Sequence, residues 1–592
     1  MSRRNLFCSL ILCGAWLGCN TPEDRQTPSS PKPTAPAKAA VAADLVLLDG
    51  NIVTVDDALG TVNALAVKGG RILAVGSTAE IQKHVAENTK VIKLEGRTAI
   101  PGFIEGHAHF IGVGNSKLIL DLSKAGTWDE VVDMVADAVK KTQPGEWIVG
   151  RGWHQEKWDR RPEGNVEGFP THNSLSAVSP NNPVSLTHAS GHAAFFNAKA
   201  MAIANVTKST KNPAGGEILK DKSGHPIGVF RETAASLVGR FRRTNQLPRA
   251  RTPHEVVRRK VELAARECLS KGVTSFQDAG SSFGSIDQFK YMAKRGRLGV
   301  RLYVMIRSSN AQLAKKLKDY RMINFADHHL TVRAVKRTID GALGSRGAWL
   351  LEPYSDSPGS KGLATAGRTA DAAIASVTRT AEVAAAQGFQ VCVHAIGDRA
   401  NREVLNIYEK LFDELENGKV VRWRIEHAQH IHPDDIPRFA QMGVIASMQG
   451  VHCTSDAPYV IPRLGEQRAR EGAYVWQDLM KSGAVVTNGT DAPVEDVDPI
   501  TSFYATVSRK TRDGTRFFPK QRMSRMEALR SYTIQCAYAA FEENDKGTLT
   551  PGKLADIVVL SKDIMTVPEE QILDAEVLYT IVGGVVKYKA GK

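Results

Sequence analysis

The chain has 592 residues, of which 42% are hydrophobic and 24% charged, so length and composition predict roughly two to four globular units with sizeable cores. The formal net charge is +14, but the densest basic run, 240–260, offers only Phe241 for stacking on bases. We therefore interpret this run as solvated surface and expect no nucleic-acid partner. Four cysteines lie outside the first 19 residues at wide spacings, which argues against a disulfide framework.

Residues 1–19 show a basic start, an apolar run and a small residue before Cys19, the pattern of a secretory signal too short for a stable membrane-spanning helix. Leu17-Gly18-Cys19 resembles the bacterial lipoprotein cleavage box. It implies lipid on Cys19 as the only membrane anchor and an exported lipoprotein of the cell envelope, at the periplasmic or outer-membrane face. Trp16 departs from the usual leucine, so soluble secretion is the alternative. Residues 20–43, rich in Pro, Ala and Thr, predict an extended linker.

Short apolar runs bounded by Asp-Gly, Gly-Gly and Glu-Gly occupy residues 44–98. This pattern predicts a small antiparallel sheet. Similar apolar runs, LADIVVL and VLYTIVGGVVKYK, occur within 547–592. We therefore expect the two chain ends to build one small β-sandwich-like domain.

Residues 99–546 contain eight apolar runs that alternate with segments of amphipathic helical periodicity. This alternation predicts the α/β class and a parallel (β/α)8 TIM barrel, with reactive groups at the carboxyl ends of the strands. The long gap after the first strand predicts an inserted subdomain at about 115–250, over the barrel mouth. The predicted strands are Ala99–His107, Val273–Asp278, Val300–Ile306, Leu330–Thr338, Phe389–His394, Arg422–His427, Val444–Met448 and Ala484–Thr490.

Potential metal ligands stand at the ends of four predicted strands. His107 and His109 are one residue apart, so on an extended strand their imidazoles point the same way. Neutral imidazole nitrogen is a ligand that suits zinc. His394, His427 and Asp491 end the fifth, sixth and eighth strands. A buried histidine is more often a hydrogen-bonded core residue, but five such groups at strand ends predict one metal site.

The segments PGFIEGHAH, VKRTIDGALGSRGA, CVHAIGD, RIEHAQ and NGTDAP resemble motifs of the amidohydrolase superfamily, and more narrowly of its amidohydrolase 3 (YtcJ-like) branch. The resemblance extends from Asp44 to about Lys589 and implies the same barrel and small β domain. It implies that Lys336 is carboxylated and bridges two divalent metal ions, most simply zinc, with one ion as the alternative. A lysine paired with Asp340 or Asp278 is the competing interpretation. The metal ligands that it implies are His107, His109, Lys336, His394, His427 and Asp491.

The reaction that the resemblance implies is hydrolysis of a non-peptide carbon–nitrogen bond, in an amide, formamide or cyclic amide, by metal-activated hydroxide. Asp491 would accept the proton of the attacking water and deliver it to the leaving nitrogen. Arg346 is a candidate for binding a substrate carboxylate or the developing oxyanion, and Asp340 and Asp278 for orienting ligands. The alternatives are a lactonase, esterase or isomerase on the same site, and a catalytically silent surface lipoprotein that binds a small molecule.

The predicted insertion contains THASGHAAFFNAKA, in which His188 and His192 are spaced for one helix face and a second metal site. Gly191 argues for a loop instead. Similar Gly-His text lies near the substrate pocket in the family, so we expect His192 to contact substrate. Trp153, with its neighbours in GRGWHQEKW, is expected to form an apolar wall of a lid. The substrate itself and the oligomeric state stay open.

Overall fold

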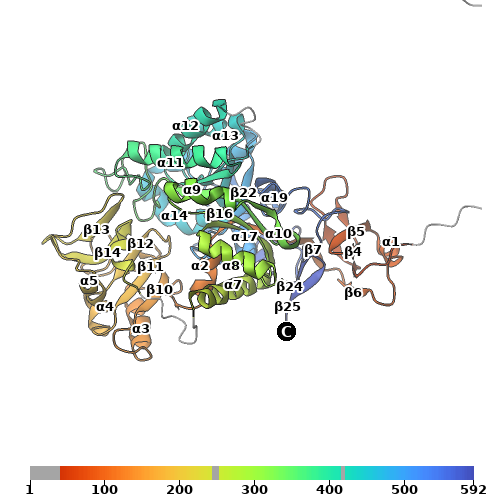
Figure 1. Cartoon of the computed structure of the whole chain (residues 1–592), viewed down its shortest axis with the longest axis horizontal. Coiled ribbons are helices and arrows are strands. Elements are labelled where there is room, and N and C mark those ends of the chain that lie inside the picture. The colour runs from red at the N-terminus through yellow and green to blue at the C-terminus, as the bar shows by residue number, and fades with distance from the viewer. Residues whose placement is uncertain (1–39, 243–251, 415–420, 592) are drawn as a thin grey trace, which may run out of the picture. The chain divides into compact units, whose positions relative to one another are not determined.

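The structure is a computed structural model that describes residues 40–242, 252–414 and 421–591, which belong almost entirely to one compact unit, Ala42–Lys592 (Figure 1). Cys19, the predicted signal and nearly all of the predicted linker lie outside the described residues. Over the described ranges, no helix combines the length and the apolar character that crossing a bilayer requires.

Eight parallel strands form a nearly closed barrel in the order β8, β15, β16, β18, β19, β20, β21, β22. The short antiparallel strand β17 (Met322–Asn324) pairs with β18 outside this series. The mixed α/β barrel predicted from alternating strands and helices is therefore confirmed. The barrel strands are β8 Phe103–Ala108, β15 Val273–Ser281, β16 Arg301–Ile306, β18 Leu330–Thr338, β19 Gln390–Ala395, β20 Arg424–His427, β21 Ile445–Gln449 and β22 Val486–Gly489.

Amphipathic helices connect the barrel strands. In α12, the buried side chains Val404, Tyr408 and Leu411 recur at helical spacing, and the Tyr408 ring meets the edge of the Trp423 ring just before β20. One apolar stripe per helix thus covers the outside of the barrel. The main connecting helices are α7 Pro253–Ser270, α8 Phe283–Ala293, α9 Asn310–Lys316, α11 Ala370–Ala386, α12 Asp398–Glu414, α13 Ile436–Met442, α14 Gly450–Leu464 and α16 Trp476–Lys481.

The first and last barrel strands, β8 and β22, meet through the residues around their carboxyl ends. Asp491 N donates to His107 O at 2.7 Å, and His109 N donates to Ala492 O at 2.8 Å. The fully buried Glu105 accepts from His107 N at 3.0 Å and from Thr490 N and Oγ1, both at 2.8 Å. Burial raises the pKa of Glu105 to about 8, although these hydrogen bonds act to lower it. The barrel therefore closes at the predicted metal ligands.

Two further sheets lie at the ends of the described chain: a four-stranded sheet of amino-terminal strands only, and a six-stranded sheet with strands from both ends. Their orders are β5-β4-β1-β6 and β25-β24-β23-β7-β2-β3, and side chains of both share one apolar cluster that includes Leu47, Val67, Ile557 and Ile581. That they form a sandwich-like domain with the predicted boundaries stays a prediction. The strands are β1 Leu45–Leu48, β2 Asn51–Val53, β3 Thr61–Val62, β4 Ala64–Lys68, β5 Arg71–Gly76, β6 Lys90–Lys93, β7 Thr98–Pro101, β23 Ile557–Leu560, β24 Val577–Val582 and β25 Val585–Lys589.

The predicted first barrel strand, Ala99–His107, is wrong as a single element. It contains β7, which pairs with β23 of the small sheet, and β8, which pairs with β15 of the barrel. The residue between them is Gly102, where an added Cβ would lie 2.2 Å from Thr274 Oγ1. The contact with Thr274 leaves space only for glycine at position 102. This glycine separates two buried strands that form one continuous apolar run in the sequence.

The segment between β8 and β15 forms a six-stranded sheet in the order β13-β14-β12-β11-β10-β9. Trp128, Leu186 and Phe195 belong to its own apolar cluster. Its status as a separate inserted subdomain of residues 115–250 stays a prediction. The elements are β9 Leu120–Asp121, β10 Ile148–Trp153, β11 Val184–His188, β12 Ala193–Phe196, β13 Gly216–Lys220 and β14 Pro226–Glu232, with α3 Trp128–Val139, α4 Asn173–Val178, α5 Ala198–Ile203 and α6 Ala235–Gly239.

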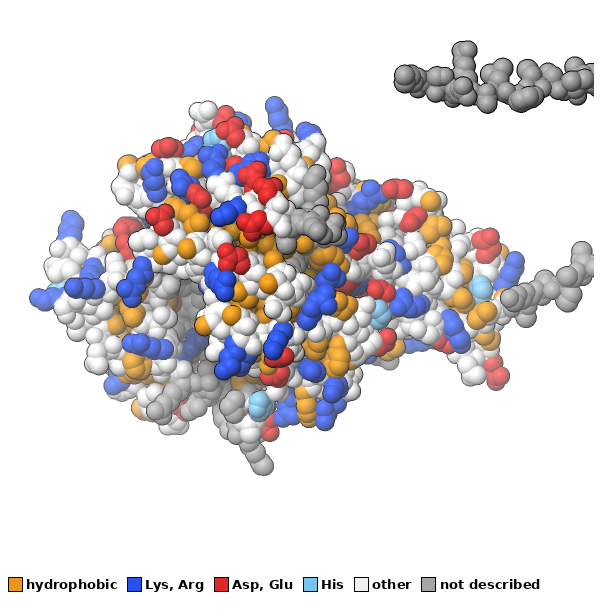
Figure 2. Space-filling model, turned by 45° about the horizontal axis from the view of Figure 1, so that its top comes forward, with side chains coloured by type: hydrophobic (Ala, Val, Ile, Leu, Met, Phe, Trp, Pro, Cys, Tyr) orange, Lys and Arg blue, Asp and Glu red, His pale blue; other side chains and the backbone are white. Residues whose placement is uncertain are grey.

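The charged side chains are mixed on the face that Figure 2 shows. Lys and Arg are interspersed with Asp and Glu across this view rather than gathered in one stripe. A positive net charge distributed in this way raises solubility without making a continuous basic track on that face.

Candidate metal centre

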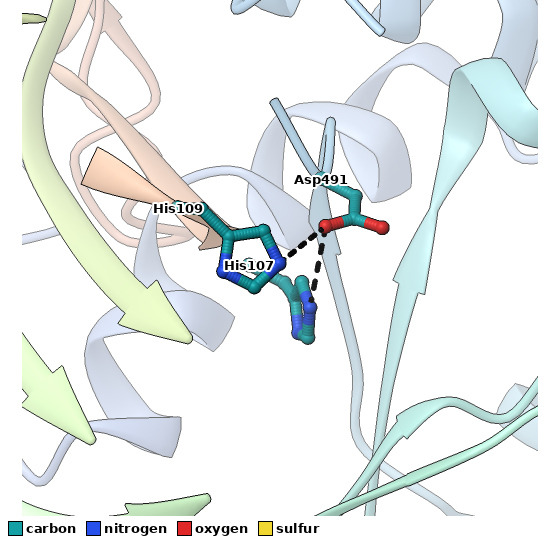
Figure 3. A group of neighbouring side chains, drawn as sticks. All are labelled: His107, His109 and Asp491. Carbon is teal, nitrogen blue, oxygen red and sulfur yellow. Dashed lines mark ion pairs between the residues drawn. The ribbon is translucent and has the colours of Figure 1, made fainter. Parts of the chain in front are cut away.

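Three potential ligands converge where β8 and β22 end. His109 Nε2 lies 3.1 Å and His107 Nε2 3.6 Å from the same oxygen, Oδ1 of Asp491 (Figure 3). The ligand atoms of these three residues all lie within 4.8 Å of one another, as coordination of one ion requires. His107 is fully buried, and the His109 side chain keeps 32% of its surface exposed. One side of the group is therefore accessible.

His394 and His427 join this group from β19 and β20. The His427 ring centroid lies 4.7 Å from that of His107 and 4.4 Å from that of His394. Both His427 and Asp491 have positive φ angles, 75° and 55°, a conformation that costs energy in a non-glycine residue. The structure thus brings together the four histidines and the aspartate that the sequence predicted as ligands.

Lys336 of β18 lies beside His107. Its Nζ lies 3.5 Å from His107 Nε2, and no ion pair joins it to Asp340 or Asp278 in the described chain. Burial lowers the pKa of Lys336 to about 8, although Glu426 acts in the opposite direction. The interpretation of Lys336 as a lysine paired with either aspartate therefore has no support in the geometry.

The donor set fits a divalent cation of the zinc type. Burial lowers the pKa of His107 to about 4 and holds those of His394 and His427 well below the usual value, so all three imidazoles are neutral. Neutral imidazole is the form that coordinates metal. Two buried ligand atoms, His394 Nε2 and Asp491 Oδ1, have no hydrogen-bond partner among the described residues. Buried polar atoms of this kind require a partner, and a cation supplies one.

Two residues that the sequence analysis missed orient the imidazoles. His107 Nδ1 donates to Glu426, and His427 Nδ1 donates to Gln449 Oε1 at 2.7 Å. Each bond fixes the tautomer that leaves Nε2 as the ligand atom. Arg424 lies beside Glu426, with Nε 2.7 Å from Oε1. The charged pair Arg-x-Glu in the buried strand VRWRIEH was the available signal.

The predicted orienting residues Asp340 and Asp278 are both buried near the site. Asp340 accepts from the backbone of Gly397 at 2.8 Å and Trp349 at 2.9 Å, and its Oδ1 lies 3.4 Å from His394 Nε2. Asp278 Oδ1 accepts from Phe110 N at 3.0 Å, directly after His109. Asp340 therefore contacts the predicted ligand His394, whereas Asp278 binds the backbone N–H that directly follows His109.

A cavity of about 600 Å³ opens from the ligand group, with His109, Lys336, His394, His427 and Asp491 in its wall. His192, predicted to contact substrate, also lines it, in the turn between β11 and β12. Its Nδ1 donates to Glu232 Oε2 at 2.8 Å. The Glu232 carboxylate lies against Gly341 and Gly347, where an added Cβ would come within 2.1 and 2.5 Å of Oε1. The glycines of the GALGSRG motif thus leave space for this carboxylate.

The other two predicted substrate residues do not line this cavity. Arg346 Nη2 lies 3.1 Å from Asp356 Oδ2, and Nη1 3.8 Å from Glu167 Oε2. Trp153 is fully buried and donates from Nε1 to Leu186 O at 3.0 Å. Trp153 is therefore a core residue of the six-stranded sheet, and Arg346 joins loops beside the site.

Comparison with known proteins places this geometry in a family. The model described as "Amidohydrolase family" matches residues 90–588. The chain belongs to the amidohydrolase family. The resemblance inferred from the five motifs is confirmed at the level of the superfamily.

Similar proteins of the family cover nearly the same length. Protein LONG AFTER FAR-RED 3 of Arabidopsis thaliana is 34% identical over 92% of each chain. The N-substituted formamide deformylase of Arthrobacter pascens is 26% identical over 92% of this chain and 98% of its own. A solved structure of an uncharacterized metal-dependent hydrolase from Pyrococcus horikoshii OT3 is 25% identical, with a TM-score of 0.69, over 89% of this chain and 99% of its own.

Proposed function

We propose that this protein is a metal-dependent hydrolase that cleaves a non-peptide carbon–nitrogen bond in a small amide, formamide or cyclic amide. The observation that carries the proposal is the convergence of His107, His109, His394, His427 and Asp491, of which all but His107 line one accessible cavity. A relative that is a formamide deformylase supports the bond type. The residues fit one or two zinc ions, and we propose two.

The bound cation would be held by the histidines and Asp491, and when bound it lowers the pKa of water and polarises a carbonyl group. The residues of the chain supply the positioning and the proton transfer. Asp491 is an ionised carboxylate at the cavity wall, so it can accept the proton of the attacking water and pass it to the leaving nitrogen. His192, held by Glu232 beside His394, would contact the substrate.

A panel of substrates tests the bond type. We expect the zinc-loaded protein to hydrolyse an N-alkylformamide or N-acyl amine at least tenfold faster than the lactone or ester of matched size. Chromatographic quantitation of the carboxylic acid released, the product common to all members of the panel, is the measurement. Faster lactone or ester cleavage would favour the alternative hydrolase. No turnover with any member by a protein that binds zinc would favour the silent ligand-binding protein.

We further propose that Lys336 is carboxylated and bridges two metal ions. Four histidines and one aspartate bring one negative charge, so a carbamate would help to hold two divalent cations. A lysine with a pKa near 8 retains neutral amine at neutral pH, and that is the form that carbon dioxide carboxylates.

Replacement of Lys336 by alanine should therefore lower the zinc content from about two ions per chain to about one. Elemental analysis of the dialysed protein measures this ratio. Acetate or another short-chain acid should restore part of the lost metal because it replaces the bridging carboxylate. Unchanged zinc content in Lys336→Ala would contradict the bridge.

We also propose export and lipid attachment at Cys19, on the pattern of residues 1–19. Soluble secretion is the alternative. Membrane fractionation of the Cys19→Ser protein distinguishes them, since retention of that variant in membranes would argue against the lipid anchor.

A further inference from the structure

Three arginines, Arg151, Arg307 and Arg337, line the cavity without a carboxylate partner in the described chain. Arg151 belongs to β10 of the six-stranded sheet and Arg307 directly follows β16 of the barrel, and both contribute to the wall that also contains His394 and Asp491. Within the described residues, neither guanidinium forms an ion pair. Both contact only neutral oxygen atoms of the protein.

The Arg151 guanidinium is fixed by backbone groups. Nε donates to Pro493 O and Nη2 donates to Ala189 O, both at 2.9 Å. Gly191, with φ of 76°, lies beside the same group, and a Cβ there would be 3.6 Å from Nη2. An arginine has five N–H donors, so two bonds orient this one and leave further donors for a ligand. Such preorganisation reduces the entropy lost on binding.

The Arg307 guanidinium makes fewer hydrogen bonds than that of Arg151. The Arg307 side chain is exposed and lines the cavity. The one hydrogen bond of the guanidinium is a long contact of Nη2 to Thr338 Oγ1, at 3.4 Å. The aliphatic part packs against Gly280, where an added Cβ would lie 3.0 Å from Cδ. The chain thus positions the stem of Arg307 and leaves most of its donors free.

These two positive charges are costly without a counterion. Surrounding protein lowers the pKa of Arg151 to about 10 and also lowers that of Arg307. The Asp491 charge stabilises both guanidinium charges from a distance, but its carboxylate contacts His109 rather than either arginine. The neighbouring Arg337 has fewer free donors than Arg307, because its guanidinium donates to Ser308 O at 3.1 Å and Ser376 Oγ at 2.9 Å. Guanidinium groups with free donors and no carboxylate partner match an anion brought by a ligand.

We infer that the substrate carries a carboxylate on the part that occupies the large cavity, and that Arg307, assisted by Arg151, binds it. The inference rests on the proposed function, because it names the substrate class of the same site: N-acyl amino acids and related anionic amides. A second cavity, of about 40 Å³, also borders His394, His427 and Asp491. It has space for a small acyl group only, so the charged part takes the large cavity of about 600 Å³.

Two probes that differ only in charge test the inference: N-formylalanine and its neutral carboxamide, N-formylalaninamide. We expect the zinc-loaded enzyme to prefer the acid. Arg307→Gln should raise KM for the acid by about 10- to 100-fold, as loss of a charged hydrogen bond does, and should leave KM for the amide within about twofold. Arg307→Lys should restore part of the loss, because it keeps the charge and loses the fork.

The matched control is Arg297→Gln, which removes the same charge from a surface ion pair with Glu262 and should change neither KM. Calorimetric binding of N-formylalanine to the zinc-loaded Asp491→Asn protein, with and without Arg307→Gln, gives a readout that needs no turnover. If neither probe is hydrolysed but the acid binds in an Arg307-dependent way, the proposed function fails and the inference stands. If both probes are hydrolysed and Arg307→Gln changes neither KM nor binding, the inference is overturned and the proposed function stands.

Discussion

Replacement of Asp491 by asparagine is expected to lower kcat by about 10²- to 10⁴-fold, the usual contribution of general acid–base catalysis. Burial alone would raise the pKa of Asp491, but the imidazole of His109, 3.1 Å away, and the proximity of His107 hold it well below its usual value. The carboxylate is therefore ionised across the working pH range and available to accept a proton. Asparagine keeps the shape and the oxygen atom but accepts no proton.

Two measurements make the Asp491→Asn result interpretable. Zinc content should stay above half of the wild-type value, because the four histidines remain, so that lost turnover reports on proton transfer. Asp496→Asn provides the control, since Asp496 is largely exposed and lies 3.5 Å from Lys271 Nζ, outside the large cavity. A zinc-loaded Asp491→Asn enzyme with kcat within threefold of wild type would refute the role of Asp491.

Replacement of Arg424 by methionine is expected to destabilise the protein by about 3–5 kcal/mol, the cost of breaking a buried ion pair by removing one partner. Arg424 is fully buried inside the barrel. Its Nη2 donates to Gly106 O and Ser447 Oγ, both at 2.7 Å, and its Nη1 donates to Gln277. These bonds join β20 to β8, β21 and β15. Methionine would also leave the Glu426 charge buried and unpaired.

Denaturant unfolding followed by circular dichroism measures the loss in Arg424→Met. Replacing both Arg424 and Glu426 by apolar residues should recover part of the stability, because no buried charge then lacks its partner. Activity should not recover, since His107 loses the group that orients it. A change below about 1 kcal/mol in Arg424→Met, the range of an exposed pair such as Arg297–Glu262, would contradict this account.

The barrel was predictable because its signals are local and repeated. Each strand is an apolar run of a few residues, and each ligand directly follows a run, so His394 and Asp491 could be placed without knowledge of their neighbours. The parallel barrel order then brings strand ends to one edge. The same reasoning fails for side chains on loops. Arg346 follows β18, but contacts with Asp356 and Glu167, both remote from the ligands in sequence, decide its direction.

The residues that support the ligands were harder to predict than the ligands themselves. Glu426 is adjacent to His427 in sequence but orients His107, 319 residues away. Gln449 and Glu105 are single polar residues in buried strands, a pattern that also fits an ordinary satisfied core residue. Their roles depend on which strands become neighbours. Trp153 shows the converse case, because a large aromatic residue in an insertion suggests a pocket wall, although packing against Trp158 and Phe195 places it in the core.

The junction of β8 and β22 has a consequence for the order of events during synthesis. Its bonds join residues as far apart as Glu105 and Thr490, separated by 385 positions. The ribosome therefore releases both histidines of the first strand long before the carboxylate that completes their site. Any nascent chain that ends before β22 has an open barrel and an incomplete ligand set. Binding of the proposed cation through Asp491 would thus belong to the last stage of chain closure.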